Sequence, residues 1–365
     1  MTLISAGWNQ FGQLGREGDC KIPSPVDFPP SEFICFSVGQ LHSILVDKNG
    51  DLYGWGSNED GGLGFANRTE VKKPTKIELN ERVVWAACGY CVTAVLTESG
   101  RVLIISEGDP VQADIPEPCE YVCCGYYLVW AIGRSGTIYQ CSSSPEDPCE
   151  KYELPEKTVQ MDAGNGFAIA ITADGQAFGF GDISPIPSTG KFEVIDSLQN
   201  VKVMKASAFE AHCIVISTDG KAYAWGSGGQ GRLGLGSYDN STVFVHVDKF
   251  DGKKVVDAAA GLAHSCFVTE DGSIYGCGNN EYGQALIGQI EMQPEPTKSE
   301  ETKNVTAVEC GNHTLAIIGG HPLKKPGIKV GAAAAAAGEH EKTKGVDKEN
   351  EKEEKKNKSS CCLLI

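Results

Sequence analysis

The chain has 365 residues, 44 glycines and a formal net charge of −16. This length allows one large domain or two average ones, and a single unit of this size buries about 75% of its unfolded surface. Residues 1–5 lack the features of a signal peptide, and no run of about 18 apolar residues occurs, so we expect neither a secretory signal nor a transmembrane helix.

Negative charge is concentrated in the first 320 residues. After Gly320 the chain has ten lysines, no arginine and seven acidic residues, so the preceding part has 32 − 10 = 22 basic and 48 − 7 = 41 acidic side chains, a net −19. DNA and RNA phosphates repel such a body, so we expect no nucleic-acid partner and favour basic protein surfaces. Without a secretory signal, the 15 cysteines are expected to be mostly reduced thiols.

A glycine-rich phrase stands near the start of the chain, Gly7-Trp8-Asn9-Gln10-Phe11-Gly12-Gln13-Leu14-Gly15. The full pattern first runs from Gly39-x-x-His42 through Gly50 and Tyr53-x-Trp55-Gly56 into Gly61-Gly62-Leu63-Gly64. An apolar run, a turn with glycine and an aromatic run predict two antiparallel strands joined by a type I′ hairpin.

The pattern repeats along the chain at a period typical of propellers and solenoids. Its turn glycines are 36 to 52 residues apart: Gly50, Gly100, Gly136, Gly175, Gly220 and Gly272. The first, fifth and sixth units are complete. The second, third and fourth (residues 89–105, 125–141 and 164–181) lack the Trp-Gly and Gly-Gln-Leu-Gly phrases.

A truncated seventh copy begins at Cys310-Gly311-Asn312-His313 and stops after Ile318. Its missing half matches the phrase at the start of the chain. The N-terminal strand is therefore predicted to complete the last blade and close a ring, which removes exposed sheet edges. Counting repeats gives seven blades, with six as the alternative.

These phrases resemble the repeat of the regulator of chromosome condensation family. The resemblance covers residues 1–320 and implies an all-β, seven-bladed β-propeller whose repeat histidine is structural. It also raises nucleotide exchange on a small GTPase, which needs no catalytic nucleophile. No residue here matches the wedge of the Ran exchange factor, and the basic DNA-binding tail of that protein is missing, which argues against Ran exchange on chromatin.

Histidines and cysteines are the residues to test as metal ligands. The repeat histidines occupy equivalent places in different units, which lie apart in a ring, so we interpret them as structural: His42, His212, His264 and His313. A zinc or redox site is the alternative for Cys88-x-x-Cys91 with Cys123-Cys124. Cys88, Cys124 and Cys310 each precede a repeat glycine, which indicates packing. We predict no metal, cofactor or catalytic residue.

The tail differs in composition from the body. Six alanines and a Lys/Glu-rich stretch in residues 321–358 cannot bury a core, which predicts a disordered tether. Residues 359–365 end in Cys362-Leu363-Leu364-Ile365, which fits the C-a-a-X prenylation pattern. Cys362 is the predicted prenyl site, with geranylgeranyl favoured, and Cys361 is the candidate for a second lipid.

Lysines upstream of the lipidation motif can add membrane affinity. Lys355, Lys356 and Lys358 are placed to meet anionic headgroups, at roughly 1 kcal/mol each. A double cysteine also suits the transferase that modifies Rab GTPases, although nothing else here resembles a GTPase. Prenylated forms of the retinitis pigmentosa GTPase regulator show a similar order of propeller and prenylation box.

Three functions follow as hypotheses. The first is a prenylated, membrane-tethered propeller on the cytoplasmic side that acts as a protein-interaction scaffold. Its expected partners are a small GTPase or its regulators, a prenyltransferase and a prenyl-binding carrier. The second is a guanine nucleotide exchange factor for a membrane-bound small GTPase. The third is a soluble nuclear partner of a chromatin enzyme, against which the prenylation motif argues.

Overall fold

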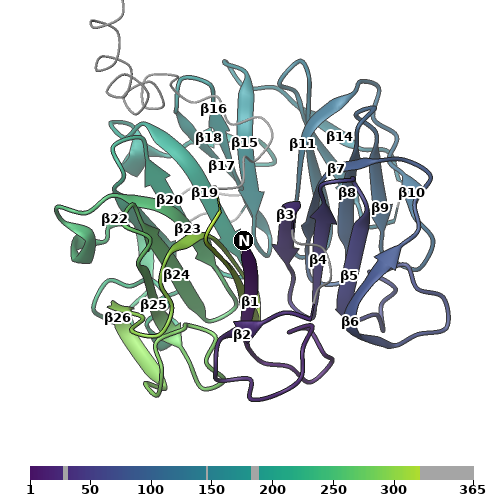
Figure 1. Ribbon diagram of the computed structural model, residues 1–365. Coiled ribbons are helices and arrows are strands. Elements are labelled where there is room, and N and C mark those ends of the chain that lie inside the picture. The colour runs from purple at the N-terminus through teal and green to yellow at the C-terminus, as the bar shows by residue number, and fades with distance from the viewer. Residues whose placement is uncertain (28–31, 145–146, 182–188, 321–365) are drawn as a thin grey trace, which may run out of the picture. The chain divides into compact units, whose positions relative to one another are not determined.

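Seven four-stranded antiparallel sheets make up the body of the protein (Figure 1). The computed structural model describes residues 1–27, 32–144, 147–181 and 189–320. The first strands of consecutive sheets contact one another in a closed cycle, from blade one round to blade seven and back. The architecture is the predicted seven-bladed β-propeller, and the alternative of six blades is wrong.

The complete repeats form blades one, five and six, in which the outermost strand has six to eight residues. Blade one consists of β3 (Phe33–Val38), β4 (His42–Asp47), β5 (Leu52–Ser57) and β6 (Glu70–Ile77). Blade five consists of β19 (Val203–Phe209), β20 (His212–Ser217), β21 (Ala222–Gly226) and β22 (Ser241–His246). Blade six consists of β23 (Val255–Ala260), β24 (His264–Thr269), β25 (Ile274–Asn279) and β26 (Met292–Lys298).

The incomplete repeats form blades two, three and four, whose outermost strands have only two or three residues. Blade two consists of β7 (Val83–Cys88), β8 (Thr93–Thr97), β9 (Val102–Ile105) and β10 (Val111–Gln112). Blade three consists of β11 (Cys119–Cys124), β12 (Leu128–Gly133), β13 (Ile138–Ser142) and β14 (Glu150–Tyr152). Blade four consists of β15 (Thr158–Ala163), β16 (Phe167–Thr172), β17 (Ala177–Gly181) and β18 (Glu193–Val194).

Blade seven joins the two ends of the propeller sequence. It combines β27 (Val305–Cys310) and β28 (His313–Ile318) with β1 (Thr2–Gly7) and β2 (Ser24–Pro25). β1 pairs antiparallel with β28 over its whole length, from Thr2 opposite Ile318 to Gly7 opposite His313. The predicted closure by the N-terminal strand is confirmed, and this blade has no unpaired edge between the two chain segments.

Helical structure among the described residues is limited to three single turns of 3-10 helix: η1 (Asp196–Leu198), η2 (Gly229–Gly231) and η3 (Asp248–Phe250). None of the helical segments described is long and apolar enough to cross a membrane.

The Asp-Gly turns differ from the predicted type I′ geometry. Between β24 and β25, Gly272 has a φ of +75°, whereas no positive φ occurs at Asp271. The Gly272 amide donates to the Thr269 carbonyl at 2.8 Å, and the Thr269 amide donates to the Ser273 carbonyl at 2.9 Å. One left-handed residue after a right-handed turn is the three-residue hairpin with a glycine bulge. Asp271 selects it because its carboxylate accepts from Thr269 and Ser273.

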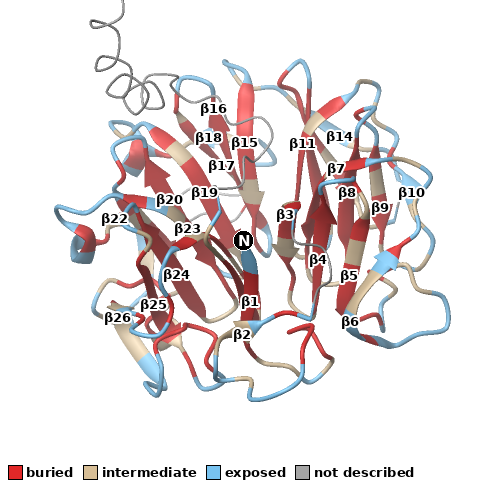
Figure 2. Ribbon diagram, viewed as in Figure 1, coloured by how far each residue is buried: buried red, intermediate tan, exposed pale blue. Residues whose placement is uncertain are grey.

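The apolar core lies between adjacent sheets. Buried residues run along the strands, while exposed residues gather in the loops (Figure 2). Trp130 of blade three is buried, and so are the small Ala168 and Ala170 of the neighbouring blade four, in the same apolar cluster. Large side chains on one sheet and small ones on its neighbour allow close face-to-face packing.

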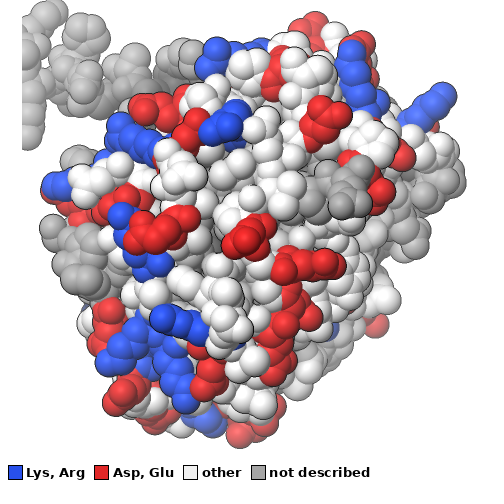
Figure 3. Space-filling model, turned by 90° about the vertical axis from the view of Figure 1, so that its right-hand side faces the viewer, with Lys and Arg blue, Asp and Glu red and all other residues white. Residues whose placement is uncertain are grey.

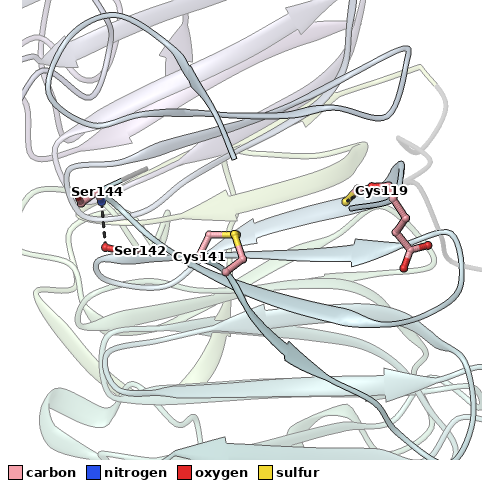
Figure 4. Close-up of a disulfide and its surroundings, with 6 residues drawn as sticks. Cys119, Cys141, Ser142 and Ser144 are labelled. Atoms are coloured by element: carbon pink, nitrogen blue, oxygen red, sulfur yellow. Dashed lines mark hydrogen bonds between the residues drawn. A yellow bond between two sulfur atoms is a disulfide. The ribbon is translucent and has the colours of Figure 1, made fainter. Parts of the chain in front are cut away.

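A disulfide joins Cys141 of β13 to Cys149, across the loop that takes the place of the glycine-rich phrase in blade three (Figure 4). Eleven other described cysteines are free. The prediction of mostly reduced thiols therefore agrees with the structure except at this pair. Cys88, Cys124 and Cys310 are buried, as their predicted packing role requires.

The predicted tether (321–358) and lipidation motif (359–365) lie outside the described residues. Five predicted site residues fall there: Lys355, Lys356, Lys358, Cys361 and Cys362.

Candidate protein-interaction face

One end of the propeller gathers the loops that carry the repeat glycines, and we call it the axial face. It holds the loops between the first and second strands and between the third and fourth strands of each blade. The residue after each repeat glycine, or after Phe209 in its place, lies near the axis. These residues form the axial ring: Gln40, Tyr90, Tyr126, Asn165, Glu210, Leu262 and Asn312.

Backbone hydrogen bonds between neighbouring blades fix the axial ring. The Tyr90 amide donates to the Tyr126 carbonyl at 3.1 Å, and the Asn165 amide donates to the Glu210 carbonyl at 2.8 Å. The Leu262 amide likewise donates to the Gly311 carbonyl at 2.8 Å. The amides of Gln40 and Tyr126 likewise donate to the carbonyls of Gly89 and Gly164 at 3.3 Å, so five of the seven members are held by a backbone bond to the next blade.

Histidine–hydroxyl pairs join blades close to this face. His42 Nε2 lies 2.9 Å from Thr93 Oγ1 of the next blade, and that hydroxyl donates to the Gly62 carbonyl at 2.7 Å. Three further pairs have the same geometry: His212 with Ser265 (2.8 Å), His264 with Thr314 (2.8 Å) and His313 with Ser43 (2.6 Å). All four histidines are buried in different blades, so their predicted structural role is confirmed.

Burial favours the neutral form of three of these histidines. It lowers the pKa of His42 to about 4 and that of His313 to about 3. The pKa of His212 lies well below its ordinary value for the same reason, with a smaller contribution from the positive charge of Arg232. A neutral imidazole can exchange one hydrogen bond with a hydroxyl, which suits a structural pair.

Both members of the pair disappear together in the incomplete blades. Val92, Leu128 and Phe167 occupy the histidine position of blades two, three and four. The hydroxyl position of the blade that follows each of them is then Val129, Ala168 or Cys213. The seven interfaces therefore divide into four that have both partners and three that have neither.

Three tyrosines stand on the axial face where the histidine pairs are missing. The rings of Tyr90 and Tyr126 stack with centroids 4.3 Å apart, and Tyr127 meets Tyr126 edge-on at 4.6 Å. Tyr127 is 53% exposed. Burial, with the neighbouring phenol of Tyr90 and the carboxylate of Glu210 contributing, raises the pKa of Tyr126. The Tyr126 phenol therefore stays neutral at physiological pH.

Glu210 is the acidic member of the axial ring. Its φ of +47° lies in the left-handed region, which is strained for a residue with a long side chain. One carboxylate oxygen accepts a long 3.4 Å bond from Asn165 Nδ2. The other, Oε2, is buried and has no hydrogen-bond partner among the described residues, and Gln40 Oε1 is in the same condition. The ring thus contains two acceptor oxygens without donors.

Charged side chains continue from the ring into the central channel. Lys205 of β19 forms a largely buried ion pair with Asp257 of β23. Asp162 and Glu309 line a small cavity of about 40 Å³. Asp162 Oδ2 accepts the amide of Ala208 at 3.0 Å, two residues before Glu210. At the mouth, burial lowers the pKa of Arg232, and the carboxylate of Glu210 opposes that shift.

A second hollow on the axial face lies between blades five, six and seven. It has a volume of about 390 Å³, and Trp8, Tyr282, Asn279 and Asn312 are among its lining residues. Gln284 Oε1 accepts from the Tyr282 amide at 2.9 Å, which orders its amide group. Aromatic rings and carboxamides suit a peptide better than a phosphate group, since no lysine or arginine lines this hollow.

One cluster has the elements of a soft-metal site. The ligand atoms of His264, Cys266 and Cys310 lie within 4.8 Å of one another, and all three residues are buried. His264 Nε2 is already bonded to Thr314, and burial raises the pKa of Cys310 well above its ordinary value. A metal needs the thiolate, so this environment favours hydrogen-bonded core residues.

The side of the propeller carries both signs of charge. Acidic and basic side chains are interspersed there beside a broad uncharged area (Figure 3). Many form exposed ion pairs, such as Lys48 with Glu32 and Arg82 with Glu98. Such pairs contribute little to stability.

The sequence analysis did not identify the axial tyrosines or Glu210 as site residues. A signal was nevertheless present, because Tyr90 and Tyr126 follow the repeat glycine directly and Phe209 replaces that glycine before Glu210. A departure from a repeat at one position is the pattern that would have indicated them.

Comparison with known proteins identifies the repeats. A model described as the "Regulator of chromosome condensation (RCC1) repeat" matches residues 49–96, 219–268 and 271–318. A second model of that repeat matches residues 33–61 and 255–284. The chain therefore contains regulator of chromosome condensation repeats, and the matches begin in the complete units and run on into blades two and seven. Neither model matches residues 97–218, which include blades three and four.

Curated relatives share the propeller and differ in length. Human "E3 ubiquitin-protein ligase HERC2" is 27% identical over 335 residues, which cover 86% of this chain, and the chain spans only 6% of it. The "X-linked retinitis pigmentosa GTPase regulator homolog" of Caenorhabditis elegans is 26% identical over 327 residues, 78% of this chain and 22% of its own. The "Secretion-regulating guanine nucleotide exchange factor" of Bos taurus is 26% identical over 364 residues, 87% of this chain and 72% of its own.

A solved structure supports the fold. Prp20p from Saccharomyces cerevisiae, described with its binding properties to Gsp1p and histones, superposes with a TM-score of 0.77. It is 19% identical, and the match covers 88% of this chain and 92% of that one. At this identity the likeness concerns the architecture alone.

Proposed function

We propose that this propeller of regulator of chromosome condensation repeats is a protein-interaction scaffold in a small-GTPase or trafficking pathway, held at a cytoplasmic membrane face by a prenyl group on Cys362. The observation that carries the tether is the sequence Cys362-Leu363-Leu364-Ile365. A second lipid on Cys361 and the cations Lys355, Lys356 and Lys358 would make attachment more durable, because a single lipid binds membranes reversibly.

The propeller is the part proposed to bind partners. Its axial face combines a rigid backbone ring, exposed aromatic rings and a hollow of about 390 Å³. Two relatives have names that refer to GTPase regulation or nucleotide exchange, which supports a small GTPase or its regulator as partner. A prenyltransferase and a prenyl-binding carrier would act on the C-terminus. The acidic body disfavours nucleic acid.

The tether is tested by mass spectrometry of the C-terminal peptide from protein isolated from its own cells. We expect a geranylgeranyl mass on Cys362 with residues 363–365 removed. The C362S variant should lose vesicle flotation, and C361S should retain part of it. An intact, unmodified C-terminal peptide would contradict the tether and favour a soluble nuclear partner of a chromatin enzyme.

The second candidate function is guanine nucleotide exchange on a membrane-bound small GTPase. The bovine relative of that name, matched over 87% of this chain, favours it. An exchange factor acts by stabilising the nucleotide-free GTPase and needs no catalytic nucleophile. No wedge residue can be matched, and the shortened blades two to four are the place where an early-blade wedge would lie.

A nucleotide-release assay separates the two functions. Prenylated GTPases of several classes are loaded with a fluorescent nucleotide and mixed with the full-length protein. Accelerated release at substoichiometric amounts would establish exchange. Stable binding without release supports the scaffold, and neither binding nor release across the panel would contradict both.

A further inference from the structure

Trp8 departs from the repeat beside the hollow of about 390 Å³ on the axial face. In the glycine-rich phrase, blades one, five and six carry Ser57, Ser227 and Asn279 at the place of Trp8. The indole is partly exposed and meets the ring of Phe11 edge-on, with centroids 5.8 Å apart. Tryptophan is enriched where partners bind, so a large ring in place of a polar side chain indicates a contact surface.

The hollow beside Trp8 offers hydrogen-bond donors that no described residue uses. The indole N–H of Trp8, which can only donate, has no acceptor among the described residues. The carboxamides of Gln230 and Asn312 form no side-chain hydrogen bond within that part of the chain. Gln284 donates to Asn279 Oδ1 at 2.5 Å, and the Nδ2 group of Asn279 donates to no described residue. These donors belong to partly exposed residues of one hollow, so a ligand can reach them together.

The lining of this hollow is aromatic and carries no carboxylate, lysine or arginine among the described residues. Tyr282, which is 38% exposed, adds a second ring to that of Trp8. Leu262 and Ala263 are the aliphatic side chains of the lining. His264 is buried, and its Nε2 is already bonded to Thr314. A ligand that complements these groups is uncharged and presents hydrogen-bond acceptors together with flat apolar surfaces.

We infer that this hollow binds a proline-rich segment of a protein partner in the polyproline II conformation. Proline has no backbone N–H, so such a segment brings carbonyl acceptors and no donor that would need an acceptor in the hollow. Its rings pack on aromatic faces, and its extended form exists before binding, which lowers the entropic cost. The lining and the segment are thus complementary in charge and in hydrogen bonding. The inference deepens the proposed scaffold function, on which it rests only in taking the partner to be a protein.

Other common modes of peptide recognition fit this hollow less well. An amphipathic helix needs a groove of large apolar side chains, whereas the aliphatic lining consists of Leu262 and Ala263. An acidic or phosphorylated segment needs arginine or lysine, which the described lining lacks. Strand addition needs an open sheet edge, whereas this lining comes from loops and strand ends.

The probe is a capped peptide of ten L-prolines labelled with a fluorophore, and its binding to the full chain is followed by anisotropy. The control peptide has ten D-prolines, which keep the composition and the apolar surface in a helix of the opposite hand. We expect saturable binding of the L peptide, at least about tenfold tighter than that of the D peptide. Equal binding of the two peptides, or no binding of either, would overturn the inference.

A neutral oligosaccharide tests the other ligand that aromatic rings and carboxamides could suit. Maltoheptaose is titrated into the full chain by calorimetry, and we expect no heat of binding. Binding of maltoheptaose together with failure of the L peptide would overturn the inference and assign the hollow to a glycan.

Variants locate the site. W8A removes the ring and the indole donor and should weaken binding of the L peptide about tenfold or more. W8F keeps a ring beside Phe11 and loses the N–H, so it should weaken binding about threefold to tenfold. Y282A should also weaken it about threefold to tenfold. The matched control is Y127A, whose tyrosine is 53% exposed on the same face and lies outside the lining, and it should stay within about twofold of the parent.

A further substitution guards against misfolding. N312A removes a carboxamide that holds no hydrogen bond within the described part of the chain, so it should fold about as stably as the parent and still weaken binding about threefold. Unchanged binding in W8A, Y282A and N312A, or an equal loss in Y127A, would show that this hollow is not the site. None of these measurements involves Cys362 or a GTPase, so their failure would leave the proposed function to its own tests.

Discussion

Four interfaces between blades are held by polar pairs, and three are held by apolar and aromatic contacts. Blades one, five, six and seven each carry a repeat histidine that meets a hydroxyl of the next blade. Blades two, three and four carry Val92, Leu128 and Phe167 at that place. Among the described residues, every repeat histidine has its hydroxyl and every such hydroxyl has its repeat histidine, which indicates that the two are lost or kept together.

The physical reason lies in the cost of half a pair. Removing one partner leaves a buried polar atom without a hydrogen bond, which costs about 1–3 kcal/mol. Replacing both by apolar groups can be nearly neutral. In the apolar part, large rings take over the packing. The ring centroid of Trp130 lies 5.3 Å from that of Phe180 and 6.0 Å from that of Phe192. Trp85 stacks on Tyr121 with ring centroids 6.1 Å apart.

Acid is expected to have the largest effect, because it destabilises the interfaces held by histidine pairs and leaves the apolar interfaces unaffected. The folded pKa values of His42 and His313 lie below the unfolded value of about 6.5. The unfolded chain therefore binds protons first as the pH falls. Burying these histidines in the neutral form contributes its full share to the free energy of unfolding above about pH 6.5. This contribution is lost as the pH falls toward 4 for His42 and toward 3 for His313. By pH 5 the loss is about 2 kcal/mol per histidine.

Urea denaturation at pH 7 and pH 5 measures this loss. The H42V/T93V variant, which copies the Val92–Val129 arrangement, should lose less stability on acidification than the parent. H246Q, in the outer strand β22, serves as the control. A parent whose stability is the same at both pH values would contradict the prediction.

Removing the central ring of the aromatic part should have the next largest effect. W130A leaves a cavity among Tyr152, Phe180 and Phe192, and we expect the free energy of unfolding to fall by about 3–5 kcal/mol. W130F keeps most of the contact and should cost clearly less. Chemical denaturation at pH 7 compares them, and equal losses would mean that ring contacts do not organise this part.

Reduction of the disulfide tests a covalent bond that, within the described part of the chain, belongs to blade three. The bond closes a loop of eight residues' separation, and its removal should cost about 2–3 kcal/mol. Thermal unfolding with and without dithiothreitol measures the effect. The C141S/C149S variant should behave like the reduced parent and be insensitive to reductant. A melting temperature unchanged by reductant in the parent would disprove a stabilising role.

Deleting a single hydroxyl of a histidine pair is expected to have the smallest effect on stability. T314V leaves His264 and the carbonyl of Gln284 without their partner and should cost about 1–3 kcal/mol. T297V, in the outer strand β26, should cost less than about 0.5 kcal/mol. If both variants unfolded at the same urea concentration, the histidine–hydroxyl pairs would contribute no more to stability than a hydroxyl in an outer strand.

Much of the fold could be predicted because short stretches of sequence within each repeat determine its strands and turns. The period of the turn glycines gave the blades, and the two half-repeats predicted the pairing of β1 with β28. The predicted turn type was wrong because Asp271 does not adopt a positive φ. Its carboxylate instead accepts two hydrogen bonds that stabilise a bulged turn. Local sequence alone does not distinguish these two hairpins.

The axial site was less predictable because it depends on contacts between blades. Tyr90 and Tyr126 are 36 residues apart and stack only because the ring brings neighbouring blades together. The orphaned oxygen of Glu210 is a property of packing, which composition does not reveal. The disulfide between Cys141 and Cys149 likewise needed the loop geometry, since a short Cys–Cys spacing by itself also suits metal binding.

Closure by β1 also constrains how the protein is made. A ribosome delivers Thr2 long before Ile318, its partner in the last blade. The opening strand must therefore wait, unpaired, while more than 300 further residues emerge and six blades assemble. Contacts of such long sequence separation form slowly, and an unpaired strand invites association with other chains. Biogenesis of this ring thus has an obligatory final step, which places β1 among the segments most in need of chaperone protection.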